Sequence, residues 1–327
     1  MNAAVPTVGV VVIGRNEGPR LVACLESLGE LIVNTAYVDS GSTDGSAEVA
    51  ERMGAAVVRL DMTVAFTAAR ARNAGLAQLR RLVPTVELVQ FVDGDCRIDA
   101  GWLAEAAGFL AENRAYAIVC GRRRERFPDA TIYNALCDRE WDTPIGDALA
   151  CGGDCLARVD ALASIGAYAA DLIAGEEPEM CVRLRAAGWK IYRLEAEMTL
   201  HDANITRLGQ WWSRSKRAGH AFAEVAHRHL GSPHEIWRRN VLRAVFWGCV
   251  LPLGAVLGAV ILHPAFLLLL AAYPLQIARI ALREGGDRLA WLYAAFALLA
   301  KFPEMQGVAQ YALNRLMGRR QGLIEYK

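Results

Sequence analysis

The first 230 residues alternate short apolar runs with amphipathic segments. β-Branched and other apolar residues predict four strands, at residues 8–13, 36–39, 56–60 and 87–92. Apolar residues at helical spacing predict the helices between and after them, at residues 21–28, 46–53, 66–82 and 99–113. Asp99 is expected to be the N-cap of the last helix, and Asp44 the N-cap of the helix at 46–53. Strands that alternate with helices predict an α/β fold with a parallel sheet and right-handed crossovers.

Polar residues gather where the predicted strands end. Asp93 and Asp95 flank Gly94 after the fourth strand, Asp39 ends the second, and residues 15–17 (Arg-Asn-Glu) follow the first. In open α/β sheets, ligands bind beyond the carboxyl ends of the strands. Mg²⁺ is usually held by one or two carboxylates together with substrate phosphates. Asp93 and Asp95 therefore predict a metal-bound diphosphate, and the alternative is a turn with solvated acids.

Basic and amide side chains lie on the helix that follows the third strand. Arg70, Arg72 and Asn73 are placed near the same sheet edge, where arginine would suit phosphate oxygens. Arg70 fits a solvated helix face equally well. The chain has no P-loop, and no GxGxxG segment follows the first strand, which argues against Walker-type ATP hydrolysis and dinucleotide binding.

Four segments in this order and spacing resemble the family-2 glycosyltransferases. They are VVVIGRNE at 10–17, VDSGSTDGS at 38–46, ARNAG at 71–75 and DGD at 93–95. The resemblance covers about the first 220 residues and implies the GT-A fold, a Rossmann-like, mostly parallel sheet flanked by helices. It also implies inverting transfer of a sugar from a nucleotide diphospho-sugar, with UDP favoured over GDP and with Mg²⁺ or Mn²⁺ as cofactor.

The resemblance assigns roles to individual residues. Asp39 matches the acid that contacts the nucleobase. The expected nucleotide-sugar-binding residues are Gly14, Arg15, Asn16, Glu17, Asp39, Arg72, Asn73, Asp93 and Gly94. Asp93 and Asp95 match the metal-binding DxD. His201 resembles a histidine that can meet the metal or the diphosphate, and the alternative for it is a structural role.

A second acidic segment supplies a candidate base. Residues 175–189 resemble the family's Glu-Asp-x-Asp signature that ends in Gly-Trp, and Glu177 takes the position of the base. A carboxylate within hydrogen-bond reach can remove the proton of an acceptor hydroxyl. Glu176 is the second candidate, and Glu179 is expected to cap the helix or pair with Arg183. The alternative is a surface helix whose first turn collects acids to match its dipole.

The acceptor side is expected around the paired glycines of residues 151–158. Gly152, Gly153 and Asp154 resemble part of the family's acceptor loop, and glycines would let the backbone approach a sugar closely. The segment at 210–214 lacks the Gln-x-x-Arg-Trp spacing of processive polysaccharide synthases. That difference favours the addition of a single sugar.

The C-terminal part of the chain is far more apolar than the rest. Hydrophobic residues make up 54% of the sequence, and they concentrate in residues 241–300. Residues 244–262 carry no charge and approach the ~20 residues that span a bilayer. Residues 265–282 could return across it after a His-Pro turn, whereas residues 289–300 are shorter and fit an interfacial or re-entrant piece. The alternative is a buried helical bundle of a soluble domain.

The distribution of arginines predicts the orientation of these spans. Basic residues precede the first span and lie at or beyond the end of the second: Arg238, Arg239, Arg243, Arg279, Arg283, Arg315, Arg319 and Arg320. The positive-inside rule then places both ends of a two-span hairpin in the cytoplasm. Residues 208–230, with paired tryptophans and basic residues, suit a membrane-surface helix. Residues 7–14 form an apolar strand without a basic leader, so no secretory signal is expected.

The net charge and the spacing of the cysteines argue against a nucleic-acid-binding, zinc-finger or CxxC redox protein. The formal net charge is +1, which gives no reason to expect nucleic acid as a partner. Eight cysteines are scattered without zinc-finger or redox spacing, which is typical of a reducing cytoplasm. These observations favour the cytoplasmic face of the inner membrane.

Together, the sequence predicts a membrane-anchored inverting glycosyltransferase. It would move one sugar to a lipid-linked or membrane-proximal acceptor in glycolipid or cell-surface polysaccharide assembly. The alternatives are a polyprenyl-phosphate sugar synthase and a non-catalytic membrane scaffold that binds nucleotide-sugar. The expected catalytic domain is residues 1–232, with a nucleotide-sugar half at about 1–115 and an acceptor half at about 116–232. Residues 233–327 would form the transmembrane or interfacial helical region.

Overall fold

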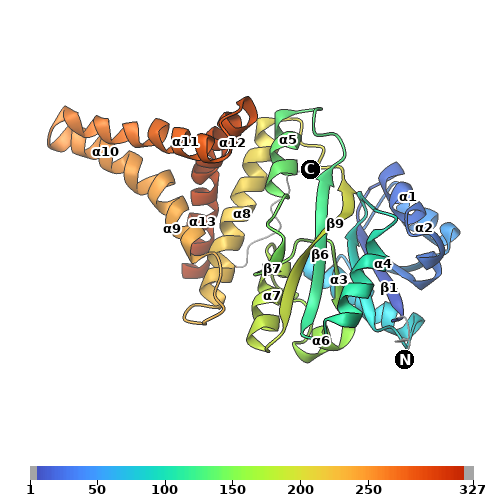
Figure 1. The fold of residues 1–327 in the computed structure, drawn as a ribbon. Coiled ribbons are helices and arrows are strands. Elements are labelled where there is room, and N and C mark those ends of the chain that lie inside the picture. The colour runs from blue at the N-terminus through green and yellow to red at the C-terminus, as the bar shows by residue number, and fades with distance from the viewer. Residues whose placement is uncertain (1–5, 320–327) are drawn as a thin grey trace. The chain divides into compact units, whose positions relative to one another are not determined.

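The computed structural model describes residues 6–319, and its contacts divide the chain after Ile205 into two units. The first unit is built around one mixed sheet (Figure 1). Its strands are β1 (Val8–Gly14), β2 (Thr35–Asp39), β3 (Ala56–Arg59), β4 (Leu88–Asp93), β5 (Cys96–Ile98), β6 (Tyr116–Glu125), β7 (Gly146–Ala148), β8 (Cys155–Arg158) and β9 (Lys190–His201). Its helices are α1 (Pro19–Glu26), η1 (Gly29–Asn34), α2 (Ser46–Met53), α3 (Ala68–Leu82), α4 (Trp102–Glu112), α5 (Ile132–Glu140), α6 (Val159–Ser164) and α7 (Glu176–Ala186).

The sheet joins a parallel half to a mixed half. Its strand order is β3-β2-β1-β4-β8-β6-β9-β5, and β7 pairs with β9. β1 to β4 pair in parallel, β8 runs antiparallel to both β4 and β6, and β6 pairs in parallel with β9. The expected α/β sheet flanked by helices is therefore confirmed. β5 was not expected, and its antiparallel pairing with β9 brings the start of β5 beside the end of β9.

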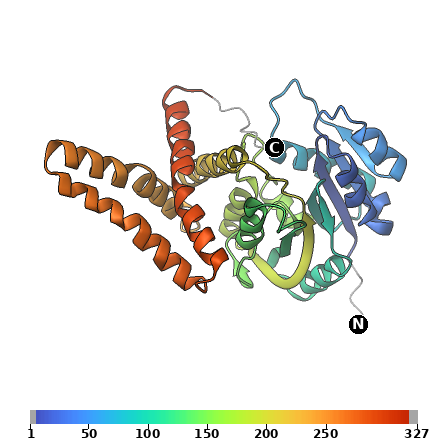
Figure 2. The same ribbon diagram turned by 90° about the horizontal axis from the view of Figure 1, so that it is seen from above.

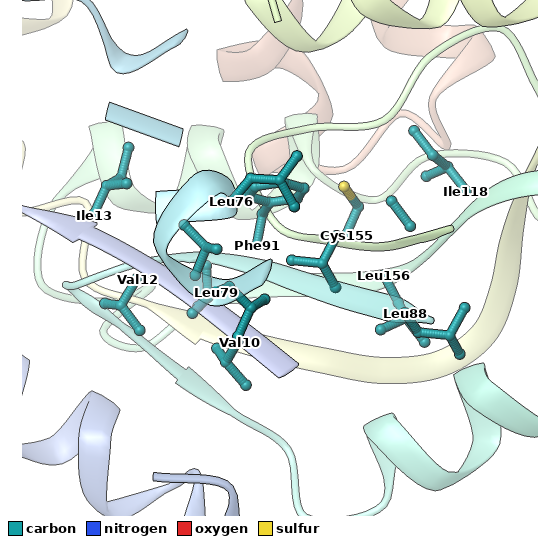
Figure 3. Packing of buried hydrophobic residues seen from close by; sticks show 14 of the residues in the cluster. Val10, Val12, Ile13, Leu76, Leu79, Leu88, Phe91, Ile118, Cys155 and Leu156 are labelled. Carbon is teal, nitrogen blue, oxygen red and sulfur yellow. The ribbon is translucent and has the colours of Figure 1, made fainter. Parts of the chain in front are cut away.

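The two faces of the parallel half are covered by different helices. Figure 3 shows Val10 and Val12 on one side of β1 and Ile13 on the other, as the two-residue period of a strand requires. Val11 lies on the face covered by α3, because its side chain meets the α3 backbone at Gly75. On the opposite face, Trp102 of α4 donates its indole N–H to Gln90 of β4 at 2.8 Å. Both faces are thus buried, which explains why these strands are continuous apolar runs.

Two expected helix caps are displaced in the structure. The prediction of Asp99 as N-cap is wrong: α4 begins at Trp102 with Gly101 at the N-cap, and the Asp99 carboxylate closes a turn by accepting the Gly101 N–H at 3.0 Å. The N-cap position of α2 is Gly45 and not Asp44. Asp44 nevertheless binds the helix start, since it accepts from the Ser46 N–H at 3.0 Å and from the Ser46 hydroxyl at 2.6 Å.

The second unit is helical. Its elements are α8 (Leu208–Arg228), α9 (Arg238–Val245), the π-helical η2 (Phe246–Val250), α10 (Leu251–Ile261), η3 (Pro264–Ala271), α11 (Ala272–Arg283), α12 (Arg288–Leu299) and α13 (Lys301–Leu316). α8 groups with this unit by contacts, ahead of the expected end of the catalytic domain at 232. That functional boundary stays a prediction.

Two helices of this unit are long and apolar enough to cross a membrane. They are Arg238–Ile261 and Pro264–Arg283, and they form a hairpin (Figures 1 and 2). Only 17% and 6% of the residues in their most apolar windows are buried. They coincide with the two spans expected from the sequence, while α12 is shorter, as expected for residues 289–300. The structure thus contains two candidate membrane spans.

The close approach of α3 to the sheet predicts opposite effects for two matched substitutions. A Cβ at Gly75 would lie 3.0 Å from Val38 Cγ2 and closer still to Val11 Cγ1, so Gly75→Ala overpacks the core. Overpacking costs about 1–3 kcal/mol, which outweighs the gain of about 1 kcal/mol in helix propensity. Gly108→Ala in α4 meets nothing within 4 Å and should stabilise. Thermal unfolding of the detergent-solubilised chain should show a lower midpoint for Gly75→Ala and a raised one for Gly108→Ala; equal shifts would contradict the packing.

Candidate active site

Arg72 lies at the centre of the candidate site because of its position on α3. The helix starts at Thr67, whose hydroxyl accepts the Arg70 N–H at 3.0 Å. Arg72, Gly75, Leu76 and Leu79 follow at helical spacing and are the buried stripe that faces the sheet. In this otherwise apolar stripe, Arg72 thus contributes a guanidinium at the carboxyl end of the strands.

The Arg72 guanidinium contacts three carboxylates from two distant segments. Its Nη2 lies 2.9 Å from Asp93 Oδ1, and its Nη1 lies 2.9 Å from Glu176 Oε1 and 2.7 Å from Glu177 Oε1. Burial alone would lower the pKa of Arg72, but the three acids outweigh it and raise that pKa well above its ordinary value. Arg72 is therefore a fixed positive charge that joins the end of β4 to the start of α7.

Asp93 also faces a second guanidinium. Arg123 of β6 lies 3.4 Å from Asp93 Oδ2, and its guanidinium lies over the Trp141 ring at 5.1 Å. Burial raises the pKa of Asp93, but the charges of Arg72 and Arg123 outweigh it and lower the pKa overall. Asp93 is therefore held ionised at neutral pH.

For Glu177, unlike Asp93, burial outweighs the nearby positive charge, and the pKa rises. α7 begins after Gly175, whose φ of 82° is readily adopted only by glycine, and its first turn carries Glu176, Glu177 and Glu179. Burial raises the pKa of Glu177 to about 7; Arg72 opposes the shift, while Glu176 and Asp93 add to it. The expected pairing of Glu179 with Arg183 is confirmed, with contacts from 2.7 to 3.0 Å. The acids are therefore buried and are not the solvated first turn of a surface helix.

A glycine of the loop before β8 completes this cluster. A Cβ at Gly153 would lie 2.9 Å from Arg72 Nη2, 3.1 Å from Asp93 Oδ2 and 3.6 Å from Glu177 Oε1, whereas a Cβ at Gly152 would meet nothing within 4 Å. The next residue, Asp154, is buried and accepts from the Asp93 N–H at 3.2 Å and the Thr199 hydroxyl at 2.7 Å. The structure thus brings the expected acceptor-side loop against Asp93 and Glu177.

Asp95 and His201 are brought together by the pairing of β5 with β9. Cys96 pairs with His201 in the sheet, and His201 Nε2 lies 3.4 Å from Asp95 Oδ1. Asp95, Cys96 and His201 are one group of side chains close enough to hold a metal ion, and Asp93, Cys96 and Asp154 are another. Burial raises the pKa of the Cys96 thiol well above its ordinary value. Carboxylate oxygen and imidazole nitrogen are therefore the donor atoms on offer, and they suit Mg²⁺ or Mn²⁺ better than a protonated thiol does.

The first two strand ends form a joined pair of turns. Asp39 pairs with Gly14 across the sheet, and its Oδ2 accepts the N–H groups of Gly41 and Ser42, each at 3.1 Å. Asn16, with a φ of 54°, accepts the Thr43 N–H at 2.8 Å and donates its own N–H to the Ser42 hydroxyl at 2.9 Å. The expected nucleotide-side residues of these turns therefore lie together at one edge of the sheet.

Glu17 links this edge to the DxD turn, and Arg15 lies exposed beside it. A Cβ at Gly14 would lie 3.2 Å from Glu17 Cγ, and a Cβ at Gly94 would lie 3.3 Å from the same atom. Glu17 also pairs with Arg20 at 2.7 Å. Both glycines therefore leave room for the Glu17 side chain between the ends of β1 and β4.

Two residues of α3 are engaged in holding loops. The Asn73 amide donates to the Tyr168 carbonyl at 2.8 Å and accepts the Tyr168 N–H at 3.1 Å. Arg70 donates to the carbonyls of Val64 at 2.6 Å and Ala65 at 2.8 Å, and also to that of Asp61. Arg70 is partly exposed and holds the preceding loop through these carbonyls. The nucleotide-binding role of Asn73 stays a prediction, since both of its amide atoms are used within the fold.

Some residues of the site were not identified from the sequence. Arg123 and Glu125 of β6, Trp141, Tyr168 and Thr199 all contact the expected residues. One signal was available for β6, because the charged run at 122–126 follows directly on the apolar residues 117–121. Their partners, however, come from other segments of the chain and leave no mark in the local pattern.

Comparison with known proteins identifies a similar family over part of the chain and a similar fold over most of it. Residues 9–147 match the family model described as Glycosyl transferase family 2. Over these residues the chain is similar to the family 2 glycosyltransferases. The resemblance drawn from the four sequence motifs is thereby confirmed.

Solved structures share the fold over nearly the whole chain. The mannosyltransferase PcManGT from Pyrobaculum calidifontis, in complex with GDP-Man and Mn²⁺, is 21% identical with a TM-score of 0.58, over 97% of this chain and 88% of that one. S. aureus TarS 1-349 is 14% identical with a TM-score of 0.52, over 96% and 92% of the two chains, and was also solved with UDP-GlcNAc. No curated protein sequence matched the chain. These similarities confirm the GT-A fold of the glycosyltransferase domain.

The charge balance of the glycosyltransferase domain predicts a pH-dependent loss of stability for Arg72→Met. Without Arg72, buried carboxylates stay unpaired, which costs about 3–5 kcal/mol where they are ionised. Their pKa values then rise above those of the unfolded chain, so the cost is full at high pH and shrinks as the pH falls and they take up protons. Thermal unfolding at about pH 8 and about pH 5 should show the larger deficit at pH 8.

Arg59→Met is the matched control for this comparison. Arg59 pairs with Glu48 and Glu51, but its side chain is 54% exposed, so the substitution should change stability little and about equally at both pH values. A deficit for Arg72→Met that stays constant with pH would show that Arg72 does not hold ionised carboxylates.

Proposed function

We propose that this chain is a membrane-anchored inverting glycosyltransferase that moves one sugar from a nucleotide diphospho-sugar to a hydroxyl of a lipid-linked or membrane-proximal acceptor. The observation that carries the proposal is the linkage of Asp93 to Glu177 through Arg72, with contacts of 2.9 and 2.7 Å. Asp93 is the proposed donor-side acid and Glu177 the proposed base, and both contact one fixed positive charge.

Glu177 is the proposed general base. An efficient base has a pKa near the working pH, and burial raises the pKa of Glu177 to about 7. Its carboxylate would accept the acceptor's hydroxyl proton while that oxygen attacks the anomeric carbon from the side opposite the diphosphate. Arg72 orients Glu177 through one guanidinium nitrogen, and Glu176 shares that nitrogen as the neighbouring acid. An acceptor that is itself a phosphate would not need a base, so a buried carboxylate at this place favours a hydroxyl.

Asp93, Asp95 and His201 would hold the divalent ion. Their donor atoms fit Mg²⁺ or Mn²⁺, and Asp95 and His201 belong to a group of side chains close enough to hold a metal ion. When bound, the ion would neutralise the charge of the departing diphosphate. The mannosyltransferase and TarS structures contain GDP-Man with Mn²⁺ and UDP-GlcNAc, which supports a nucleotide-sugar donor here. We propose a uridine donor, with guanosine as the other possibility.

The candidate spans support an anchor in the inner membrane. Leu253, Val260 and Leu268 are among their exposed large side chains, and a bilayer would cover such apolar surface. Arginines stand at the outer ends of the hairpin, including Arg238, Arg239 and Arg283. The positive-inside rule then assigns the glycosyltransferase domain to the cytoplasmic face, where it would meet acceptors for glycolipid or cell-surface polysaccharide assembly.

Replacing Glu177 tests the proposed base. Glu177→Gln should lower kcat/KM by about 10²–10⁴-fold, the usual contribution of a general base. In the wild type, kcat/KM should rise with pH through about 7 as the carboxylate loses its proton, and Glu177→Gln should lose that rise. Nucleotide-sugar turnover with a hydroxyl acceptor in detergent is the measurement.

Two results would contradict this assignment in different ways. Nearly full activity of Glu177→Gln would point to a lipid-phosphate acceptor. A wild type that binds a nucleotide-sugar with metal but neither transfers nor slowly hydrolyses it would point to a non-catalytic scaffold. Donor hydrolysis that is lost in Asp95→Asn would exclude the scaffold.

The glycine pair offers a matched test of the site geometry. Gly153→Ala places a methyl group against Arg72, Asp93 and Glu177 and should lower kcat by about 10–100-fold, the scale expected when reacting groups shift by about 1 Å. Gly152→Ala has open space and should retain activity within about 2-fold. The measurement is steady-state kinetics of both variants, with thermal unfolding midpoints as a check that both fold. Equal kinetics would mean that Gly153 does not pack against the reacting groups.

A further inference from the structure

His201 has one ring nitrogen facing the proposed metal site and one facing into the protein. Nε2 lies 3.4 Å from Asp95 Oδ1. Nδ1 is buried without a hydrogen-bond partner, and Glu125 Oε2 lies 3.9 Å from it. The ring also packs edge-to-face against Trp141, with centroids 4.8 Å apart. The imidazole is therefore confined between Asp95 and Glu125.

Glu125 is held rigidly at the end of β6. Its Oε1 accepts the Phe127 N–H at 3.0 Å and the Asn134 amide at 3.3 Å, and its Oε2 accepts the Ala203 N–H at 2.9 Å. The residue is 3% exposed. These donors fix the Glu125 side chain away from water, with Oε2 on the side of His201.

This arrangement matches the way in which a histidine binds a metal ion. A ligating histidine binds the ion through the lone pair of one nitrogen, and its other nitrogen then carries the proton and donates it to a carboxylate or carbonyl. If Nε2 offers its lone pair to an ion held beside Asp95, the ring proton has to be on Nδ1. The Nδ1–Oε2 separation of 3.9 Å would have to close by about 1 Å to reach hydrogen-bond distance.

We propose that Glu125 is a positioning residue that fixes the Nδ1–H form and the ring orientation of His201, so that Nε2 is a ligand for the divalent ion. The proposal rests on the proposed metal site. Nothing in it requires Glu125 to touch the ion, the donor or the acceptor. Its effect passes through His201 alone.

Mn²⁺ affinity of the detergent-solubilised full chain is the direct test. Titration followed by the electron paramagnetic resonance signal of free Mn²⁺ should show binding about 10–100-fold weaker in Glu125→Gln, the usual loss when such a partner is removed. Pulsed measurements on bound Mn²⁺ should show ¹⁴N coupling from imidazole in the wild type and its loss in the variant.

A double-mutant cycle separates positioning from a general effect on the fold. In the His201→Ala background, Glu125→Gln should change Mn²⁺ affinity by less than about 2-fold, because residues that act through one another are not additive. The same loss in both backgrounds would overturn the proposal. Absence of Mn²⁺ binding by the wild type would instead overturn the metal site itself, so the two failures are distinguishable.

A measurement on the unchanged protein covers the case in which Glu125→Gln fails to fold. ¹⁵N-histidine NMR of the wild type with Mg²⁺ reports which nitrogen of His201 carries the proton, with His201→Ala assigning the signal. A proton on Nδ1 is expected. A proton on Nε2 would overturn the proposal.

Discussion

The placement of Arg72 among three buried carboxylates is the constraint on which the site depends. Buried ion pairs seldom repay the cost of removing charges from water, so this cluster is poorly explained as a source of stability. The acids outnumber the guanidinium, so they cannot all be equally stabilised in the ionised form. Their pKa values therefore differ with their surroundings. Asp93, between Arg72 and Arg123, has a lowered pKa, while Glu177 has a pKa raised to about 7. One arginine thus allows a permanently ionised acid and a proton acceptor to stand in the same small region.

The same excess of negative charge would favour a cation in this site. Asp93, Asp95, Asp154, Glu176 and Glu177 face it, and Arg72 and Arg123 are the guanidiniums that contact them in the described residues. A diphosphate would add further negative charge, which two arginines already engaged with carboxylates do not balance. Asp95 Oδ1 lies 3.4 Å from Nε2 of the His201 imidazole. Charge therefore favours a divalent ion there when a diphosphate binds.

The sequence predicted what local patterns determine. Strands β1 to β4, helix α2 and the turn at Gly94 follow from apolar runs and turn residues, and the buried stripe from Arg72 to Leu79 is visible in the helical spacing. It did not predict β5, because a three-residue strand exists only through its pairing with β9. Nor did it predict that Arg72 would meet Glu176, 104 residues away, or that the Asn73 amide would bind the Tyr168 backbone. These residues meet only in the packed fold. Because the same residue types are equally common on protein surfaces, the sequence alone does not reveal the contacts.

The helical unit poses the remaining physical question, which is what covers its apolar hairpin. A bundle of a soluble domain would bury these helices, yet Val260, Ile261 and Leu268 are 79%, 72% and 75% exposed within the described chain. Charged side chains are confined to the outer ends of the hairpin, where Arg238 begins one helix and Arg283 ends the other. Backbone polar groups within each helix are bonded internally, which is the condition for residing in lipid. A bilayer would therefore satisfy the whole hairpin surface at once.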